Sequence, residues 1–304
     1  MDTTAIRPVS AETLMDRASP ARADVLAPLL ASNGSALVYG PGGVGKTFFA
    51  LGIAWAAASG GSFLGWRAAR PHRVLYIDGE LGAADMRERL ALFGRPPPGL
   101  KLVLPDLSDG PLLDLAQPEG IVSLMAGWND PELVVIDSLA SLAGLNGDPE
   151  RWNNLQNFLI HQRTYGHRAV VLVHHANRDG GLRGSTRCVD ALDLVIALRR
   201  PKDWRAADGA RFEIHFEKAR RLRGDAAEPI LAQLTSEPGQ PAHWRWGRVP
   251  LGSFERAVAL LKQGVKPEAM GRALGISRST AFDYQRKARE RGLLSMVPLT
   301  ESNH

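Results

Sequence analysis

The sequence predicts an α/β fold, in which a mostly parallel β-sheet is followed by a small all-helical unit. Three observations lead to this prediction. Short apolar runs alternate with helical segments along the first 235 residues, the first run leads into a glycine-rich loop, and basic charge gathers near the C-terminus. Such alternation is typical of parallel strands whose connecting helices cover both faces of the sheet.

The parallel strands are expected at five apolar runs, residues 35–39, 73–78, 133–137, 169–174 and 192–198. Two further runs follow without long helices between them and are expected to add antiparallel strands, at residues 211–218 and 229–234. We therefore expect an N-terminal arm over residues 1–33, an α/β core over residues 34–248 and a helical domain over residues 252–296.

The composition is that of a globular protein. The chain has 304 residues, of which 44% are hydrophobic and 23% charged. Its one cysteine, Cys188, excludes a disulfide framework or a cysteine-rich metal site and fits a reducing compartment. Because there is no apolar signal core and no run of 18 apolar residues, we expect a cytoplasmic protein without a membrane partner.

Residues 40–47 match the phosphate-binding pattern G-x-x-x-x-G-K-[ST] through Gly40, Gly45, Lys46 and Thr47. In such a P-loop, backbone N–H groups surround phosphate oxygens, the lysine reaches the β- and γ-phosphates, and the threonine hydroxyl binds Mg²⁺. An apolar strand before the loop and an Ala-rich helix after it argue against a chance match. The residues predicted to bind ATP are Gly40, Pro41, Gly42, Gly43, Val44, Gly45, Lys46, Thr47 and Phe48.

Polar side chains follow three of the predicted strands. Asp137 ends the run at 133–137 and, with Thr47, is expected to hold Mg²⁺. Glu80 lies just beyond the run at 73–78, where open α/β sheets bind ligands, and could orient and deprotonate the attacking water. His174 or Asn177 could hydrogen-bond the γ-phosphate. Each of these could instead be an ordinary strand cap or surface acid.

These elements together resemble the RecA-like ATPases, and most closely the RepA-type hexameric replicative helicases of plasmids. The resemblance covers residues 30–235 and rests on the P-loop, Glu80, the Val-Val-Ile-Asp-Ser at 134–138, the Leu-Val-His-His-Ala at 172–176 and the Arg-Gly-Ser at 183–185. It implies a RecA-like P-loop NTPase core, a homo-oligomer, expected to be a hexamer, and a DNA-dependent ATPase. It also implies that Glu80, rather than Asp78, is the catalytic base.

The resemblance assigns two further groups of basic residues. The stretch 177–187 would face a central channel, where Arg178, Arg183 and Arg187 would meet single-stranded DNA. Lys218 and Arg220 resemble the Lys-x-Arg pair that ring helicases insert into the neighbouring subunit's ATP site. A solvated charged turn and a basic strand end are the alternatives.

Residues 252–294 hold nine Lys or Arg against four Asp or Glu, which accounts for the net charge of +5 of the whole chain. Residues 266–284 resemble a helix-turn-helix, with Pro267 in a first helical turn, Gly271 at a close helix crossing, Gly275 in the turn and Ser277 as the cap of a second helix. The residues expected to meet duplex DNA are Arg278, Ser279, Thr280, Tyr284 and Arg286. A protein-binding role for this unit stays open.

The sequence thus favours a ring-forming helicase or translocase that acts in DNA replication. Two alternatives remain: a DNA-binding regulator that ATP controls, and an accessory ATPase of recombination or repair.

Overall fold

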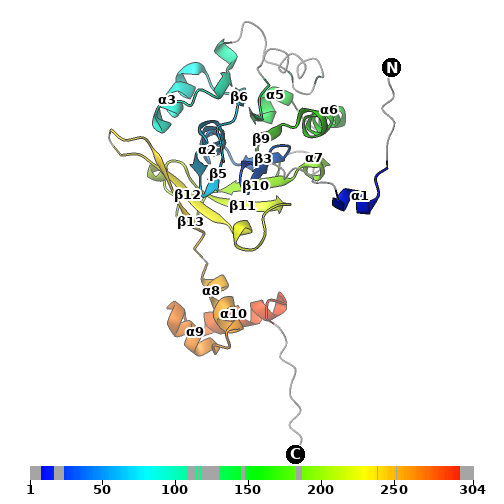
Figure 1. Cartoon of the computed structure of the whole chain (residues 1–304). Coiled ribbons are helices and arrows are strands. Elements are labelled where there is room, and N and C mark those ends of the chain that lie inside the picture. The colour runs from blue at the N-terminus through cyan, green and yellow to red at the C-terminus, as the bar shows by residue number, and fades with distance from the viewer. Residues whose placement is uncertain are drawn as a thin grey trace, which may run out of the picture. The chain divides into compact units, whose positions relative to one another are not determined.

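The computed structural model describes residues 8–16, 24–107, 114, 117, 130–144, 148–182, 187–237, 239–250 and 252–294. The chain divides into two compact units, Met1–Arg248 and Val249–His304 (Figure 1). Within the described residues, no helix is long and apolar enough to cross a bilayer.

A nine-stranded sheet forms the centre of the first unit, in the order β13-β12-β11-β10-β3-β9-β8-β6-β7. Six neighbouring strands are parallel: β3 (Ser35–Gly40), β6 (Val74–Asp78), β7 (Leu100–Val103), β8 (Leu133–Asp137), β9 (Ala169–His175) and β10 (Leu194–Arg199). The other three are antiparallel: β11 (Arg211–Ala219), β12 (Ile230–Thr235) and β13 (His243–Arg248). The predicted α/β class is confirmed, although β7 and β13 were not among the expected strands.

Helices cover both faces of the sheet. One face packs on α2 (Lys46–Ser59) and α3 (Ala83–Phe93), through strand residues such as Val135 and Val173. The other face packs on α5 (Leu139–Ala143), α6 (Pro149–His161) and α7 (Arg187–Ala191), through the alternate strand positions. Since successive strand side chains point to opposite faces, a residue's parity along a strand decides whether it meets α2 or α6.

The stretch before residue 34, expected as an arm or as an adaptor onto the core, packs on the core from Asp24 onward. There β1 (Asp24–Leu26) pairs with β2 (Leu30–Ala31), and Val25 and Leu26 are fully buried in the α2-side core. Burying such aliphatic side chains contributes roughly 1.5–3 kcal/mol each. The hairpin is therefore part of the core, whereas α1 (Ala11–Asp16) buries no residue. A second small hairpin, β4 (Ser62–Phe63) with β5 (Trp66–Arg67), follows α2.

The second unit contains three helices, α8 (Ser253–Lys262), α9 (Pro267–Leu274) and α10 (Arg278–Glu290), around a core of Ala257, Met270 and Ala281. A Cβ on Gly271 would lie 3.3 Å from the Ala281 Cβ, so α9 and α10 cross closely there. Gly275 ends α9 with a φ of 64°, and the Ser277 hydroxyl accepts a hydrogen bond from the Thr280 amide. Each of these residues has the local role that the sequence predicted.

Candidate active site

The P-loop joins the C-terminal end of β3 to the N-terminus of α2. Gly45 has a φ of 111°, and a Cβ on it would lie 2.9 Å from the Phe212 ring. A Cβ on Gly40 would lie 2.7 Å from the Leu198 carbonyl oxygen. Packing therefore requires glycine at both positions, and the backbone conformation also requires it at Gly45.

Lys46 is buried at the base of this loop, with 7% of its surface exposed. Its ammonium donates to the carbonyls of Gly40 at 3.1 Å and Pro41 at 3.0 Å, and lies 3.4 Å from Nδ1 of His175. Burial lowers the pKa of Lys46, and the carboxylates of Asp137 and Glu80 partly offset that shift. A cation is thus held against the P-loop beside two acids.

Asp137 ends β8 on the α2 face, and its peptide bond to Ser138 is cis. The carboxylate accepts a hydrogen bond from the Tyr76 hydroxyl at 2.7 Å, and the Thr47 hydroxyl lies close to it. Burial raises the pKa of Asp137, while these two hydroxyls lower it. A hydroxyl beside one carboxylate offers hard oxygen ligands and few of them, which fits Mg²⁺, an ion that usually keeps several waters.

Glu80 follows β6, and its carboxylate meets two polar groups from neighbouring strands. It accepts a hydrogen bond from the Ser138 hydroxyl and lies 3.0 Å from Nε2 of His175. Burial raises the pKa of Glu80, but the Ser138 and His175 hydrogen bonds outweigh it, so the net pKa is lowered. The carboxylate is 44% exposed and ionised, as a base that must reach water requires.

Asp78 shapes the turn that carries Glu80. Its Oδ1 accepts hydrogen bonds from the amides of Glu80 at 2.8 Å and Leu81 at 2.7 Å. Asp78 itself is only 1% exposed, so it supports the turn and does not face solvent. The geometry therefore presents Glu80, and not Asp78, to the open side of the site.

His174 was predicted at the reacting phosphate, and the structure contradicts this. Its ring is 4% exposed and lies against Trp152 of α6, with 6.4 Å between ring centroids. His175, the next residue, instead lies between Lys46 and Glu80. Alternation along β9 is the reason, since Val171, Val173 and His175 share the α2 side while His174 shares the α6 side. The side chain of Asn177, the other expected contact, instead accepts hydrogen bonds through Oδ1 from the backbone amides of Asp179 and Gly181.

Arg200 also belongs to this region, and the sequence analysis did not identify it. Its guanidinium donates to the carbonyls of Gly42 at 3.4 Å and Gly43 at 3.2 Å, and stacks 4.2 Å over the Trp204 ring. It therefore holds the outer side of the P-loop. The Arg-Arg-Pro that follows β10 was the available signal.

Lys218 and Arg220 lie at the other end of the sheet, where β11 pairs with the first residues of β10. The Lys218 ammonium donates to the carbonyls of Val189 at 2.6 Å and Asp190 at 3.1 Å. Arg220 bonds to Asp193 at 3.2 Å and to the Asp190 carbonyl at 3.3 Å. The structure does not bring this pair to the P-loop of the same chain.

Of the three arginines expected in a channel loop, Arg178 is exposed in the turn after β9. A bridge between Ala176 and Leu182 closes this turn. Arg183 and the side chain of Arg187 lie outside the described residues.

In the second unit, the predicted DNA contacts differ in their surroundings. Tyr284 packs on the three-helix core, with its ring 5.4 Å from that of Phe254. Arg286 is paired with Asp283 and, at 3.0 Å, with Glu290. Arg278 is 78% exposed, and its ion pair with Glu268 is long at 3.6 Å. Ser279 and Thr280 stay at the exposed start of α10, hydrogen-bonded to Ser277.

Comparison with known proteins agrees with this geometry. Residues 2–181, more than half of the chain, match the family described as "AAA domain". The chain belongs to this family. Among solved structures it is similar to a KaiC-like protein from the hyperthermophilic archaeon Pyrococcus horikoshii OT3, with 16% identity and a TM-score of 0.51 over 69% of this chain and 90% of the other. No curated protein is similar enough to count as a relative. Family and fold together identify a RecA-like P-loop ATPase.

Proposed function

We propose that this AAA domain protein is a ring-forming, DNA-dependent ATPase of the RepA helicase type. The observation that carries the proposal is the position of Lys218 and Arg220. They lie at the amino end of the parallel strands, while the P-loop follows the carboxyl end of β3. Strand β3 has six residues, a span of about 20 Å. This position argues against a role at the nucleotide of the same chain and supports a role at the nucleotide of another subunit.

Within one subunit, the site divides the work of hydrolysis among its residues. The P-loop amides and Lys46 would bind the β- and γ-phosphates, and Thr47 with Asp137 would hold the Mg²⁺, which neutralises phosphate charge when bound. Glu80 would accept a proton from the attacking water. Ser138 and His175 hold the Glu80 carboxylate in the orientation that this step needs.

His175 also links this chemistry to the turn that carries Arg178. Its Nδ1 faces Lys46 and its Nε2 faces Glu80, which fits a neutral ring with its proton on Nε2. Two residues later, Asn177 begins the turn that ends at Leu182. A change of charge at the γ-phosphate would therefore be transmitted to Arg178, which we propose contacts single-stranded DNA.

The second unit supports a duplex-binding role. Its short turn between α9 and α10, its capped second helix and the charge of +5 on residues 252–294 are typical of a helix-turn-helix that binds DNA. The exposed face of α10 carries Arg278 beside Phe282, which is 40% exposed. This unit favours the second candidate function, a DNA-binding regulator whose assembly ATP controls.

The two functions differ in what stimulates hydrolysis. We would measure ATP turnover alone, with single-stranded DNA and with duplex DNA, and determine particle symmetry with an ATP analogue. A translocase should form closed rings whose turnover rises with single strands. Stimulation by duplex DNA alone, without closed rings, would instead support the regulator.

A further inference from the structure

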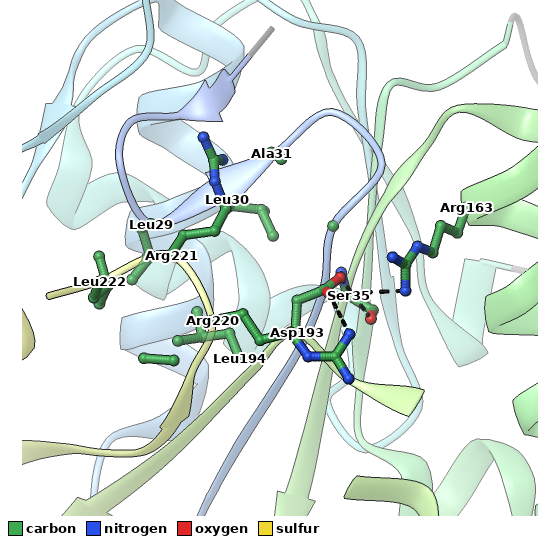
Figure 2. Close-up of a pocket in the computed structure, with 12 residues that line it drawn as sticks. Leu29, Leu30, Ala31, Ser35, Arg163, Asp193, Leu194, Arg220, Arg221 and Leu222 are labelled. Carbon is green, nitrogen blue, oxygen red and sulfur yellow. Dashed lines mark hydrogen bonds and ion pairs between the residues drawn. The ribbon is translucent and has the colours of Figure 1, made fainter. Parts of the chain in front are cut away.

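A cavity of about 200 Å³ lies at the amino end of β3 and β10, at the opposite end of the sheet from the P-loop. Its lining includes three arginines, Arg163, Arg220 and Arg221, and one central acid, Asp193 (Figure 2). Arg163 belongs to η2 (Gln162–Gly166), a single π-helical turn after α6. Such turns occur frequently at functional sites.

Asp193 joins the parts of this cavity. Its Oδ2 accepts hydrogen bonds from the Ser35 amide at 3.1 Å and from the Ser35 hydroxyl at 3.4 Å. Its Oδ1 lies 3.2 Å from Nη1 of Arg220 and 3.8 Å from Nη1 of Arg163 (Figure 2). One carboxylate, anchored on the start of β3, thus holds two guanidinium groups toward the same place.

The cations around this carboxylate exceed its charge. Arg163 and Arg220 share Asp193, and both are partly exposed, at 37% and 46%. Lys218, beside them, is held by the carbonyls of Val189 and Asp190. Arg221 differs, because Asp24 compensates its charge. The cavity therefore has a surplus of positive charge, which suits a polyanion such as a triphosphate end.

We propose that Arg163 is a second arginine that acts in trans, and that this cavity receives the γ-phosphate end of the nucleotide bound by another copy of the chain. Asp193 is the positioning residue that holds Arg163 and Arg220 ready for it. This inference rests on the proposed ring-forming ATPase. It extends the trans-acting group beyond Lys218 and Arg220 to a residue from a different element, η2.

The test compares ATP turnover and nucleotide affinity of Arg163→Gln with those of Arg163→Lys, Arg220→Ala and the control Arg70→Gln. Arg70 lies outside the lining of this cavity and pairs with Glu132 at the surface, so its variant should stay within about twofold of wild type. Arg163→Gln should lower kcat about tenfold or more with little change in ATP affinity. Arg163→Lys should recover part of that loss, because the charge is kept. Melting curves of all variants should confirm that they fold.

Mixing distinguishes a trans role from a structural one. Neither Arg163→Gln nor Glu80→Gln should turn over ATP well alone. Mixed rings should gain activity, because an intact Glu80 then meets an intact Arg163 at some interfaces. If Arg220→Ala gains activity on mixing but Arg163→Gln does not, the site is shared between subunits but Arg163 does not act in trans. Turnover of Arg163→Gln at the wild-type rate would likewise exclude a trans role for Arg163. If the wild-type protein does not hydrolyse ATP, both the proposed function and this inference are wrong.

Discussion

His175 Nε2 lies 3.0 Å from the Glu80 carboxylate, while Nδ1 of the same ring lies 3.4 Å from the Lys46 ammonium. Three strands contribute to this contact, since Glu80 follows β6, Lys46 follows β3 and His175 ends β9. Glu80 and Lys46 are therefore connected through one imidazole ring. Changes to the three residues should have separable effects on binding and turnover.

Lys46→Ala should weaken nucleotide binding, whereas Glu80→Gln should bind ATP and lose turnover by about 100-fold or more. The amide keeps the shape of the carboxylate but cannot accept the proton from water. Binding of a fluorescent ATP analogue and steady-state phosphate release would be measured for both variants. Turnover of Glu80→Gln at the wild-type rate would mean that another residue is the base.

His175→Ala should lower kcat about tenfold and change ATP affinity little, because it removes a hydrogen bond that orients Glu80 rather than a phosphate ligand. His174→Asn is the matched control. Since His174 packs against Trp152, that change should lower the melting temperature and leave kcat near wild type. A loss of kcat in His174→Asn but not in His175→Ala would show that His174, and not His175, supports turnover.

A structural feature could be predicted from the sequence where the contacts that determine it are local. The P-loop fixes the roles of Gly45, Lys46 and Thr47 within eight residues, so that motif was readable. The choice between His174 and His175 was not, because β9 is buried on both faces and its apolar residues do not show which parity meets α2. The β1–β2 hairpin was missed because its pairing and burial depend on tertiary contacts.

The sequence already carried a signal for the surroundings of Tyr284 and Arg286 in the second unit. Tyr284 lies three residues after Ala281 and four before Ala288, so helical spacing puts all three on one face, and both alanines are fully buried. Likewise, Asp283 and Glu290 lie three residues before and four residues after Arg286, at the spacing of ion pairs on a helix. The spacing along the helix alone therefore predicts the packing of Tyr284 and the ion pairs of Arg286.

Arg220→Ala should leave ATP binding intact and reduce turnover on the order of 10³-fold, because an arginine supplied in trans acts mainly on the transition state. Mixing it with Glu80→Gln protein should restore activity at the mixed interfaces. Turnover would be followed across mixing ratios, with sedimentation to measure assembly. A monomeric species under ATP, with no gain at any ratio, would contradict the shared site.

Asp78 should make stability depend on pH. Burial raises its pKa to about 6, although the amides of Leu81 and Glu80 lower it, against an ordinary value of 3.8. Between pH 4 and pH 6 the folded protein binds a proton that the unfolded chain has released. Protonation of Asp78 therefore contributes fully to the free energy of unfolding below about pH 4, and this contribution is lost as pH rises through about 6.

Asp78→Asn keeps an acceptor for the two amides and removes the carboxylate. It should therefore be more stable than wild type at pH 7, by about 1–3 kcal/mol, with the difference vanishing near pH 4. Urea unfolding of both proteins from pH 4 to 7.5 would measure this. A difference that does not change with pH would show that Asp78 does not titrate in this range.

The second unit should bind duplex DNA independently of ATP hydrolysis. It follows residue 248 as a separate compact unit, whereas the P-loop belongs to the first unit. Deleting residues 252–304 should abolish duplex binding and leave ATP turnover and its stimulation by single strands mostly in place. Arg178→Ala should instead weaken binding to single strands and make its salt dependence shallower, because fewer phosphates are neutralised.

Two arginines of α10 offer a sharper comparison. Arg278 is 78% exposed with one long ion pair, whereas Arg286 is held between Asp283 and Glu290. Arg278→Ala should therefore weaken duplex binding more than Arg286→Ala, and should reduce the slope of log affinity against log salt by about 1. Titrations of labelled duplex at several salt concentrations would measure both. If the truncated protein keeps full duplex affinity and neither arginine matters, the three-helix unit is a protein-binding module instead.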